Sequence, residues 1–310
     1  MNFCRSDMAT VKSWIKAARP RTLPLAVSGI LAGCGLALFY GVVSISVSVL
    51  AATTAIFIQI FSNFANDYGD SQKGTDNEHR LGPVRTIQGG EITPREMKKG
   101  MLTIATASVT CGLALLYIAT WNQWKPAFFL FLGFGILSLL AAWFYTAGKR
   151  SYGYIGLGDL SVFLFFGLLP VAGAFYLNTG FIKSEIFLPA VSLGCFSTGV
   201  LNLNNMRDID NDRKSGKITI PVRLNRKNSR VYHCLLIFTG WVATIFFLII
   251  THKTLWQWTC LLTLPLFLTD LFRIIRINEN MGFDPYLKRL SMSTLAFTLL
   301  FCTGLIIAAQ

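Results

Sequence analysis

The sequence predicts an all-α, polytopic membrane protein, in which long helices cross a bilayer and are joined mostly by short segments. Three observations lead to this fold class. Apolar residues make up 53% of the 310 residues and charged residues only 14%, whereas soluble domains carry about 25% charged residues. The mean hydropathy is +0.52. The apolar residues also form runs long enough to cross a hydrocarbon core of about 30 Å.

A spanning helix needs about 20 mainly apolar residues, and the chain contains roughly nine such runs. The sequence therefore predicts nine transmembrane helices. Arg19, Pro20 and Arg21 directly precede the first run and no small-residue cleavage site follows, so this run is expected to stay as a helix rather than to be removed as a signal peptide. In chain order, the runs cover 23–41, 45–65, 100–120, 127–147, 156–178, 186–204, 232–251, 255–272 and 291–309.

The connections between the runs contain no low-complexity linker, so we expect a single domain over 1–310. Only the segments 66–99 and 205–230 are long, and they follow the second and the sixth run. Both contain an acidic cluster followed by the letters PVR. This shared pattern favours an internal duplication, in which a four-helix unit occurs twice, at 23–147 and 156–272, and is followed by a ninth helix.

The basic charge is strongly lopsided along the chain. If successive runs alternate across the membrane, all but three of the 28 Lys and Arg residues fall on one side; the exceptions are Lys125, Lys183 and Lys253. Because positive charge marks the cytoplasmic side, the N-terminus is expected in the cytoplasm and the C-terminus outside, in the inner (cytoplasmic) membrane of a cell. The net charge of +13 is thereby explained by the lipid bilayer as partner, and no nucleic acid is expected.

Two clusters of Asn and Asp lie at the inner ends of the second and sixth runs. On a helix, residues four apart share one face, so each cluster directs several oxygen ligands the same way. Hard oxygen ligands without His or Cys select Mg²⁺ or Ca²⁺, and Mg²⁺ often joins one or two carboxylates to phosphate oxygens. The ligand candidates are Asn66, Asp67 and Asp70 in the first cluster, and Asn204, Asp208 and Asp212 in the second.

Basic residues follow or interrupt both clusters, and such side chains bind phosphate oxygens. Together they suggest a Mg²⁺-bridged diphosphate at the cytoplasmic face, with its apolar tail lying among the helices. The cations are Arg80, Arg85, Arg207, Arg213, Lys217 and Arg223, with Lys149 and Arg150 at the end of the fourth run.

Two other interpretations remain open at this point. A single acidic turn such as NDYGD is usually an ordinary solvated turn. Two such clusters at matching helix ends argue against this interpretation. A cation-coupled transporter also carries buried Asp and Asn rows, but typically near the middle of the membrane and in interrupted helices. Here the clusters lie at one face beside phosphate-binding cations, which favours an enzyme.

At these residues the chain resembles the UbiA superfamily of intramembrane prenyltransferases, which have nine helices and acidic motifs after helices two and six. Within the superfamily it is most similar to the branch that uses 1,4-dihydroxy-2-naphthoate. The third carboxylate departs from the common spacing, because position 74 is Gly and Asp76 follows. The resemblance rests on ARPRTLPLAVSGILAG (18–33), NDYGDSQKGTD (66–76), RLGPVRTIQGGEIT (80–93), GDLSVFLFFGLLPVAG (158–173) and NNMRDIDNDRKSGKITIPVRL (204–224).

The resemblance implies a menaquinone-biosynthesis reaction, in which a polyprenyl diphosphate alkylates 1,4-dihydroxy-2-naphthoate with loss of diphosphate and CO₂ to give demethylmenaquinone. Homogentisate or 4-hydroxybenzoate is the alternative acceptor. Tyr145, four residues before Lys149, either shields the allylic cation or is an interfacial aromatic. By resemblance, Mg²⁺ is held by Asp67, Asp70, Asp76, Asp208 and Asp212, assisted by Asn66 and Asn204 or Asn205; the diphosphate contacts are Arg80, Arg85, Lys149, Arg207 and Lys217.

Overall fold

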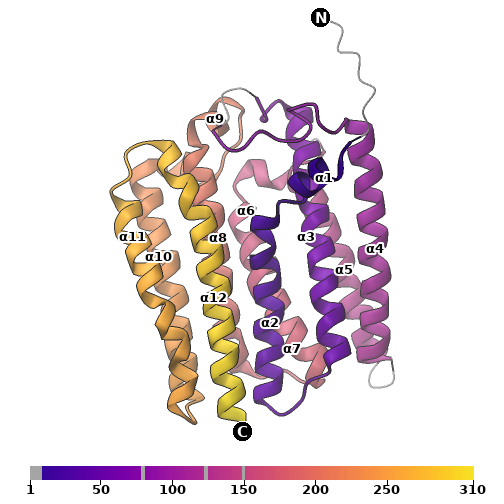
Figure 1. Ribbon diagram of the computed structural model, residues 1–310, viewed down its shortest axis with the longest axis vertical. Helices are drawn as coiled ribbons and strands as arrows, with labels where there is room; N and C mark the ends of the chain where they lie inside the picture. The colour runs from indigo at the N-terminus through magenta and orange to yellow at the C-terminus, as the bar shows by residue number, and fades with distance from the viewer. Residues whose placement is uncertain (1–8, 78–80, 122–124, 149–150) are drawn as a thin grey trace, which may run out of the picture.

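Apolar helices run side by side through the whole length of the molecule (Figure 1). The computed structural model describes residues 9–77, 81–121, 125–148 and 151–310, and no strand occurs among them. Within these ranges, nine helical segments are long and apolar enough to cross a membrane, which confirms the predicted all-α fold class. The segments are Val11–Phe39, Ile45–Lys73, Pro94–Thr120, Lys125–Phe144, Gly158–Thr179, Ser184–Arg207, Ile220–Ile250, Leu255–Ile275 and Asn280–Ala309.

Several spans are built from more than one helix. The fifth span, for example, contains a π-helical stretch between α6 and α7, at Phe163–Leu168. The α-helices are α1 (Val11–Ala18), α2 (Leu23–Phe39), α3 (Ile45–Lys73), α4 (Pro94–Thr120), α5 (Lys125–Phe144), α6 (Gly158–Val162), α7 (Leu169–Thr179), α8 (Phe187–Arg207), α9 (Ile209–Lys214), α10 (Ile220–Ile250), α11 (Leu264–Ile275) and α12 (Asp284–Ala309).

The helices extend beyond their apolar runs at the basic end of the molecule. α3 continues to Lys73 and α8 to Arg207, so most of both acidic clusters is helical. α10 starts at Ile220, twelve residues before its predicted apolar run, and contains a break at Asn225, where φ is +65°. The polar end of α8 is buried among neighbouring elements, whereas residues 225–228 at the start of α10 are exposed.

Both long polar connections lie at the same end of the bundle. Figure 1 shows α9 and the segment between α3 and α4 beside one another at the end where α1 lies, with the C-terminus at the opposite end. Asn211 joins the two connections directly, because its amide donates to the backbone oxygen of Thr75 at 3.0 Å. The fold therefore brings together two acidic clusters that are far apart in the sequence. Which side of a membrane this end faces stays a prediction.

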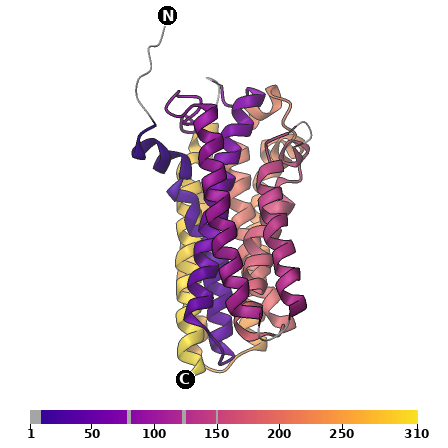
Figure 2. The same ribbon diagram turned by 90° about the vertical axis from the view of Figure 1, so that its right-hand side faces the viewer.

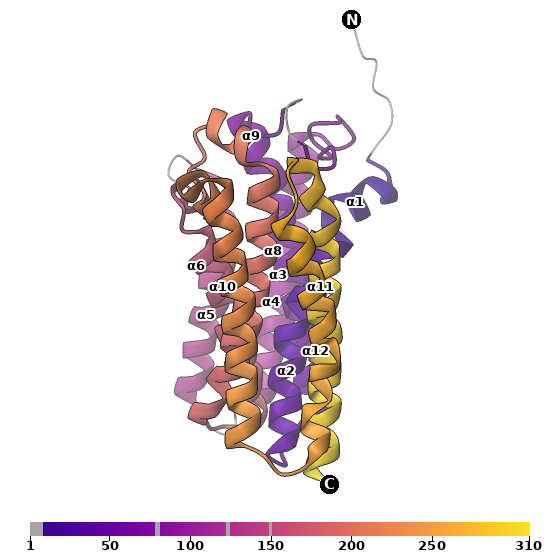
Figure 3. The same cartoon turned by 90° about the vertical axis from the view of Figure 1, so that its left-hand side faces the viewer.

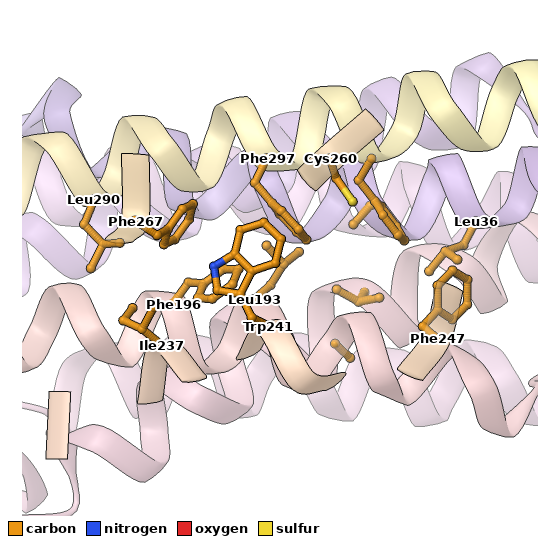
Figure 4. Close-up of a cluster of buried hydrophobic side chains, with 14 of the residues drawn as sticks. Leu36, Leu193, Phe196, Ile237, Trp241, Phe247, Cys260, Phe267, Leu290 and Phe297 are labelled. Carbon is orange, nitrogen blue, oxygen red and sulfur yellow. The ribbon is translucent and has the colours of Figure 1, made fainter. Parts of the chain in front are cut away.

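One half of the bundle has a solid interior. α12 packs against α2 and α8, and α10 packs against α8 (Figure 3). Between them lies an aromatic cluster, seen in Figure 4, with the Phe196 and Phe267 ring centroids 4.7 Å apart and those of Trp241 and Phe297 5.3 Å apart. Since lipid tails are as apolar as these rings, close packing rather than water exclusion holds this half together.

The amphipathic helix α1 lies beside the bundle rather than within it (Figure 2). Trp14 packs on Phe64 of α3, with the ring centroids 5.3 Å apart, while Val11 on the other face is exposed. The chain then turns sharply at Arg19, whose φ of +50° is unusual for a residue with a side chain. This turn directs Arg19 toward the end of α3 that carries the first acidic cluster.

Candidate functional site

A cavity of about 550 Å³ lies in the other half of the bundle, among α2, α3, α4, α5, α7 and α8. Its walls are mainly apolar along the helices and polar at the end that carries the acidic clusters. Such a cavity suits an amphipathic molecule with one charged end. Apolar lining residues include Ile58, Leu116, Phe131, Leu132 and Phe166; polar ones include Asn66, Asp70, Arg85, Asn204, Asn205 and Lys217.

The first acidic cluster supplies Asn66 and Asp70 to this cavity. Because α3 is helical through both residues, their side chains share the face that lines it. Asp70 Oδ1 accepts a hydrogen bond of 2.8 Å from the Tyr154 hydroxyl, and Asn66 Oδ1 accepts one of 3.2 Å from Thr146 Oγ1.

Asp67 has a different environment from its neighbours. It is 1% exposed and does not line the cavity. Its carboxylate forms an ion pair with Arg19, lies 3.5 Å from Arg85 Nη1 and accepts a hydrogen bond from Thr86 Oγ1 at 3.2 Å. These contacts tie α1 and the segment after α3 to the helix. The structure therefore separates Asp67, which pairs with cations of the protein, from Asp70, which lines the cavity.

Arg85 connects the first cluster to Asp76, the third carboxylate of this segment. It lines the cavity, and its Nε lies 3.8 Å from Oδ1 of Asp76, whose side chain is buried. Asp76 is thus close to a cavity cation without being itself a cavity residue. Two further predicted contacts, Arg80 and Lys149, lie outside the described residues.

The second acidic cluster spans a helix break. α8 ends at Arg207 and α9 begins at Ile209, so the expected row of Asn204, Asp208 and Asp212 is interrupted at Asp208. The i→i+4 backbone hydrogen bonds nevertheless continue through it, at 3.1 Å from Asp208 N and 2.8 Å from Asp212 N. Asn204 and Asn205 line the cavity, whereas Asp208 and Asp212 lie behind its lining. Asp212 Oδ1 lies 3.6 Å from Lys217 Nζ, and Lys217 also lines the cavity.

Arg207 does not occupy the predicted substrate-binding position. It is 0% exposed, and it does not line the cavity. Its Nε and Nη2 bind Oδ1 and Oδ2 of Asp208 at 3.0 and 2.7 Å, its Nη1 pairs with Asp284 of α12, and Nη2 also reaches Asn204 Oδ1 at 2.9 Å. Nε, Nη1 and Nη2 of Arg207 are therefore all engaged by side chains of the protein. Arg207 orients Asp208 and Asn204, which sequence spacing alone does not indicate.

Tyr145 lines the cavity from a position just after the end of α5. α5 ends at Phe144, and Gly148 has a φ of +83°, so residues 145–148 form turns. Gly69 allows this close approach, since a Cβ there would lie 2.7 Å from the backbone carbon of Thr146. Burial and the Asp159 carboxylate hold the pKa of the Tyr145 phenol well above its usual range, so the group is a neutral hydroxyl.

Tyr154 joins the two clusters, and no sequence pattern pointed to it. Its hydroxyl donates to Asp70, while Lys73 Nζ lies 4.0 Å and Lys217 Nζ 5.7 Å from the centre of its ring. Its backbone oxygen accepts from Ile218 N at 2.9 Å. A loop tyrosine carries no periodic signal, so only its sequence neighbours in the 145–157 segment could have suggested a role.

The donor set fits a divalent cation that is shared with a ligand. Among the described residues, no group of three or more His, Cys, Asp or Glu side chains could hold a metal by itself. Burial and the charges of Asp208 and Asp70, opposed by Lys217, raise the pKa of Asp212 to about 6, and its buried Oδ2 has no hydrogen-bond partner in the described part of the chain. Mg²⁺ commonly completes such a partial carboxylate set with waters and phosphate oxygens.

A cavity with an apolar body, and with residues of both Asn/Asp clusters at its polar end, is typical of membrane proteins that bind amphipathic molecules with a charged end. The comparisons with known proteins give the family. A UbiA prenyltransferase profile matches residues 26–282, and the chain belongs to this family. The 1,4-dihydroxy-2-naphthoate octaprenyltransferase of Haemophilus influenzae is 42% identical over 299 residues, or 96% of each chain. The protein of the same name from Escherichia coli is 40% identical over 302 residues, or 97% of each chain.

Solved structures agree with the fold. The apo UbiA homologue from Aeropyrum pernix aligns with a TM-score of 0.66 at 17% identity, covering 91% of this chain and 97% of that chain. A UbiA homologue from Archaeoglobus fulgidus, bound to DMAPP and Mg²⁺, aligns with a TM-score of 0.60 at 16% identity, covering 91% and 98%. At these identities the likeness shows a shared architecture.

Proposed function

We propose that this protein transfers a polyprenyl group from polyprenyl diphosphate to 1,4-dihydroxy-2-naphthoate, with loss of diphosphate and CO₂, to give demethylmenaquinone in its reduced form. The observation that carries the proposal is the cavity, whose polar end holds residues of both acidic clusters and whose walls are apolar. Identities of 42% and 40% to two 1,4-dihydroxy-2-naphthoate octaprenyltransferases, over nearly whole chains, support the choice of acceptor.

Mg²⁺ held by Asp70, Asp208 and Asp212, with Asn66 and Asn204 beside them, would supply Lewis-acid neutralisation of the departing diphosphate. Among the cavity residues, Arg85 and Lys217 present positive charge to the same oxygens. Asp67, Arg207 and Tyr154 act one step further out, because they hold the backbone and carboxylates of the two clusters in place.

The apolar walls protect the reactive intermediate. When the allylic C–O bond breaks, its electron pair leaves with the diphosphate and a carbocation remains, which water would quench. The ring of Tyr145, at the polar end of the cavity, is placed to stabilise positive charge through its π-face. The electron-rich naphthoate carbon then forms the new C–C bond, and the carboxylate leaves as CO₂ while its bonding pair restores the aromatic ring. Arg21 and Lys288, which also line the cavity, would balance the carboxylate charge before it leaves.

The position in the cell follows from the charge distribution along the chain. Because Lys and Arg flank the helix ends near α1 and α9, this end would face the cytoplasm, which places the reaction at the cytoplasmic face of the inner membrane. The polyprenyl tail would then extend from the polar end into the hydrocarbon layer. We expect no nucleic acid as a partner.

The direct test incubates the purified protein with Mg²⁺, labelled polyprenyl diphosphate and, separately, 1,4-dihydroxy-2-naphthoate, homogentisate and 4-hydroxybenzoate. The expected result is a prenylated product and CO₂ release with the naphthoate, both dependent on Mg²⁺. Turnover with one of the other acceptors and none with the naphthoate would reject the proposed substrate. Cation-driven uptake into proteoliposomes without prenyl transfer would reject the enzyme class.

The Mg²⁺ requirement is expected to depend on pH. A protonated Asp212 cannot bind the cation, and its pKa is raised to about 6, so metal affinity is full above this pH and falls below it. The Mg²⁺ concentration for half-maximal rate should therefore rise by about tenfold per pH unit below the pKa. Mg²⁺ titrations at several pH values measure this, and Asp212→Asn should abolish that dependence. An equal dependence in the variant would assign it to another group.

A further inference from the structure

A chain of hydrogen bonds forms part of the cavity wall below the acidic clusters. Gln59 Nε2 donates to Thr22 Oγ1 at 3.2 Å and to Asn63 Oδ1 at 3.3 Å. Asn63 Nδ2 in turn donates to Thr22 Oγ1 at 3.1 Å and to the backbone oxygen of Ala18 at 2.8 Å. All three side chains of this Thr22–Asn63–Gln59 chain line the cavity.

The direction of every hydrogen bond in this chain is fixed by the backbone. The backbone oxygen of Ala18 can only accept, so Asn63 must turn its NH₂ group toward it. The hydroxyl of Thr22 donates its one hydrogen to the backbone oxygen of Arg19, at 2.9 Å. Thr22 Oγ1 can therefore only accept from the two amides, and Asn63 Oδ1 faces Gln59. The amide of Gln59 must then present its NH₂ group to both, which removes the usual ambiguity between amide nitrogen and oxygen.

One acceptor is left over at the end of this chain. Oε1 of Gln59 accepts no hydrogen bond in the part of the protein that the structure describes, although the residue is only 7% exposed. Because Gln59 lines the cavity, this oxygen is open to a molecule bound there, and a ligand that supplies a hydrogen would satisfy it. Because the oxygen can only accept, the matching ligand group must be a donor, such as a hydroxyl.

The position of Gln59 fits the aromatic acceptor rather than the diphosphate. It lies seven residues before Asn66 on α3, which corresponds to about 10 Å along the helix axis. This separation leaves room for the diphosphate at the acidic clusters and for an acceptor ring beyond the reacting prenyl carbon. The Thr22–Asn63–Gln59 chain contains no cationic residue, so it supplies no positive charge that would bind the diphosphate.

We propose that Gln59 Oε1 accepts a hydrogen bond from a phenolic hydroxyl of the aromatic acceptor and thereby selects hydroxylated acceptors; this rests on the proposed function. In 1,4-dihydroxy-2-naphthoate, the 1-hydroxyl is adjacent to the carboxylate and is satisfied by it. The 4-hydroxyl, on the opposite side of the ring, is the one available to Gln59. Gln59 is thus a specificity-determining residue, with Thr22 and Asn63 as the positioning residues that orient its amide.

The test compares two ligands on two proteins. The wild-type protein is expected to bind 1,4-dihydroxy-2-naphthoate about tenfold more tightly than 1-hydroxy-2-naphthoate, measured as a competitive inhibition constant. In Gln59→Leu this preference should shrink to about one, with KM for the acceptor raised about tenfold, while KM for the diphosphate and the Mg²⁺ requirement stay unchanged. The control Thr53→Val, on α3 but outside the cavity lining, should keep the full preference.

A second arm needs no folded variant. The 4-methoxy analogue cannot donate a hydrogen bond, so the wild-type protein should bind it no more tightly than the compound without the 4-hydroxyl. A Gln59→Leu protein that retains the tenfold preference, or a wild type that binds the methoxy analogue as well as the dihydroxy compound, overturns the inference. A wild type that turns over another acceptor but not the naphthoate would instead reject the proposed function, so the two failures are distinguishable.

Discussion

Replacing Asp70 by asparagine is expected to lower kcat/KM by about a thousandfold, while the protein still inserts into membranes and folds. The change keeps the shape of the side chain but removes a negative charge from the cavity face of α3, where the metal-bound diphosphate would lie. Loss of a few kcal/mol of charge stabilisation in the transition state corresponds to this factor. Initial rates over a range of Mg²⁺ concentrations measure the effect.

Asp210 provides the matched control for this experiment. It belongs to the second acidic cluster, but its side chain is 56% exposed and it pairs with Arg226 at 2.6 Å, away from the cavity. Asp210→Asn should therefore retain nearly the full rate. Equal losses in both variants would show that general negative charge at this end, and not the cavity position of Asp70, supports the reaction.

Arg207→Leu is expected to lower the free energy of unfolding by about 3–5 kcal/mol, because it leaves the buried carboxylate of Asp208 without its cation. The loss should appear as a lower midpoint in reversible denaturant titrations of the detergent-solubilised protein. Arg226→Leu removes a comparable ion pair with Asp210, but both side chains there are largely exposed, so a loss below about 1 kcal/mol is expected. Similar losses in the two variants would contradict the structural role given to Arg207.

The helices and the position of the two clusters could be predicted because each rests on a local pattern. Apolar runs of spanning length define the helices, and a spacing of four places Asn66 and Asp70 on one face. What happens to Asp67 could not be predicted in this way. Its partner Arg19 depends on a left-handed turn after α1, and such a turn has no signature when the residue is not glycine.

Contacts between side chains that are far apart in the sequence also explain the other differences between the predicted and the observed site. Arg207 is next to Asp208 in the sequence, but only the start of α12, which supplies Asp284, makes its complete enclosure possible. Tyr154 contacts Asp70, which is far away in the chain, and belongs to no periodic pattern. Gln59 shares the helical face of Asn63, Asn66 and Asp70, but its contact with Thr22 depends on the packing of a distant segment. The proposed duplication of 23–147 and 156–272 stays a prediction.

The uneven interior of the bundle has a consequence for how the chain is assembled during synthesis. The helices made first, α2 to α5, surround the cavity and already pack on one another, chiefly α3 on α4, whereas the solid cluster needs α8, α10, α11 and α12. Since α12 packs against α2, the first spanning helix receives its main neighbour only when the last one leaves the ribosome. Chains that end before residue 284 lack α12, so α2 and α8 should lose a packing partner and become more sensitive to limited proteolysis.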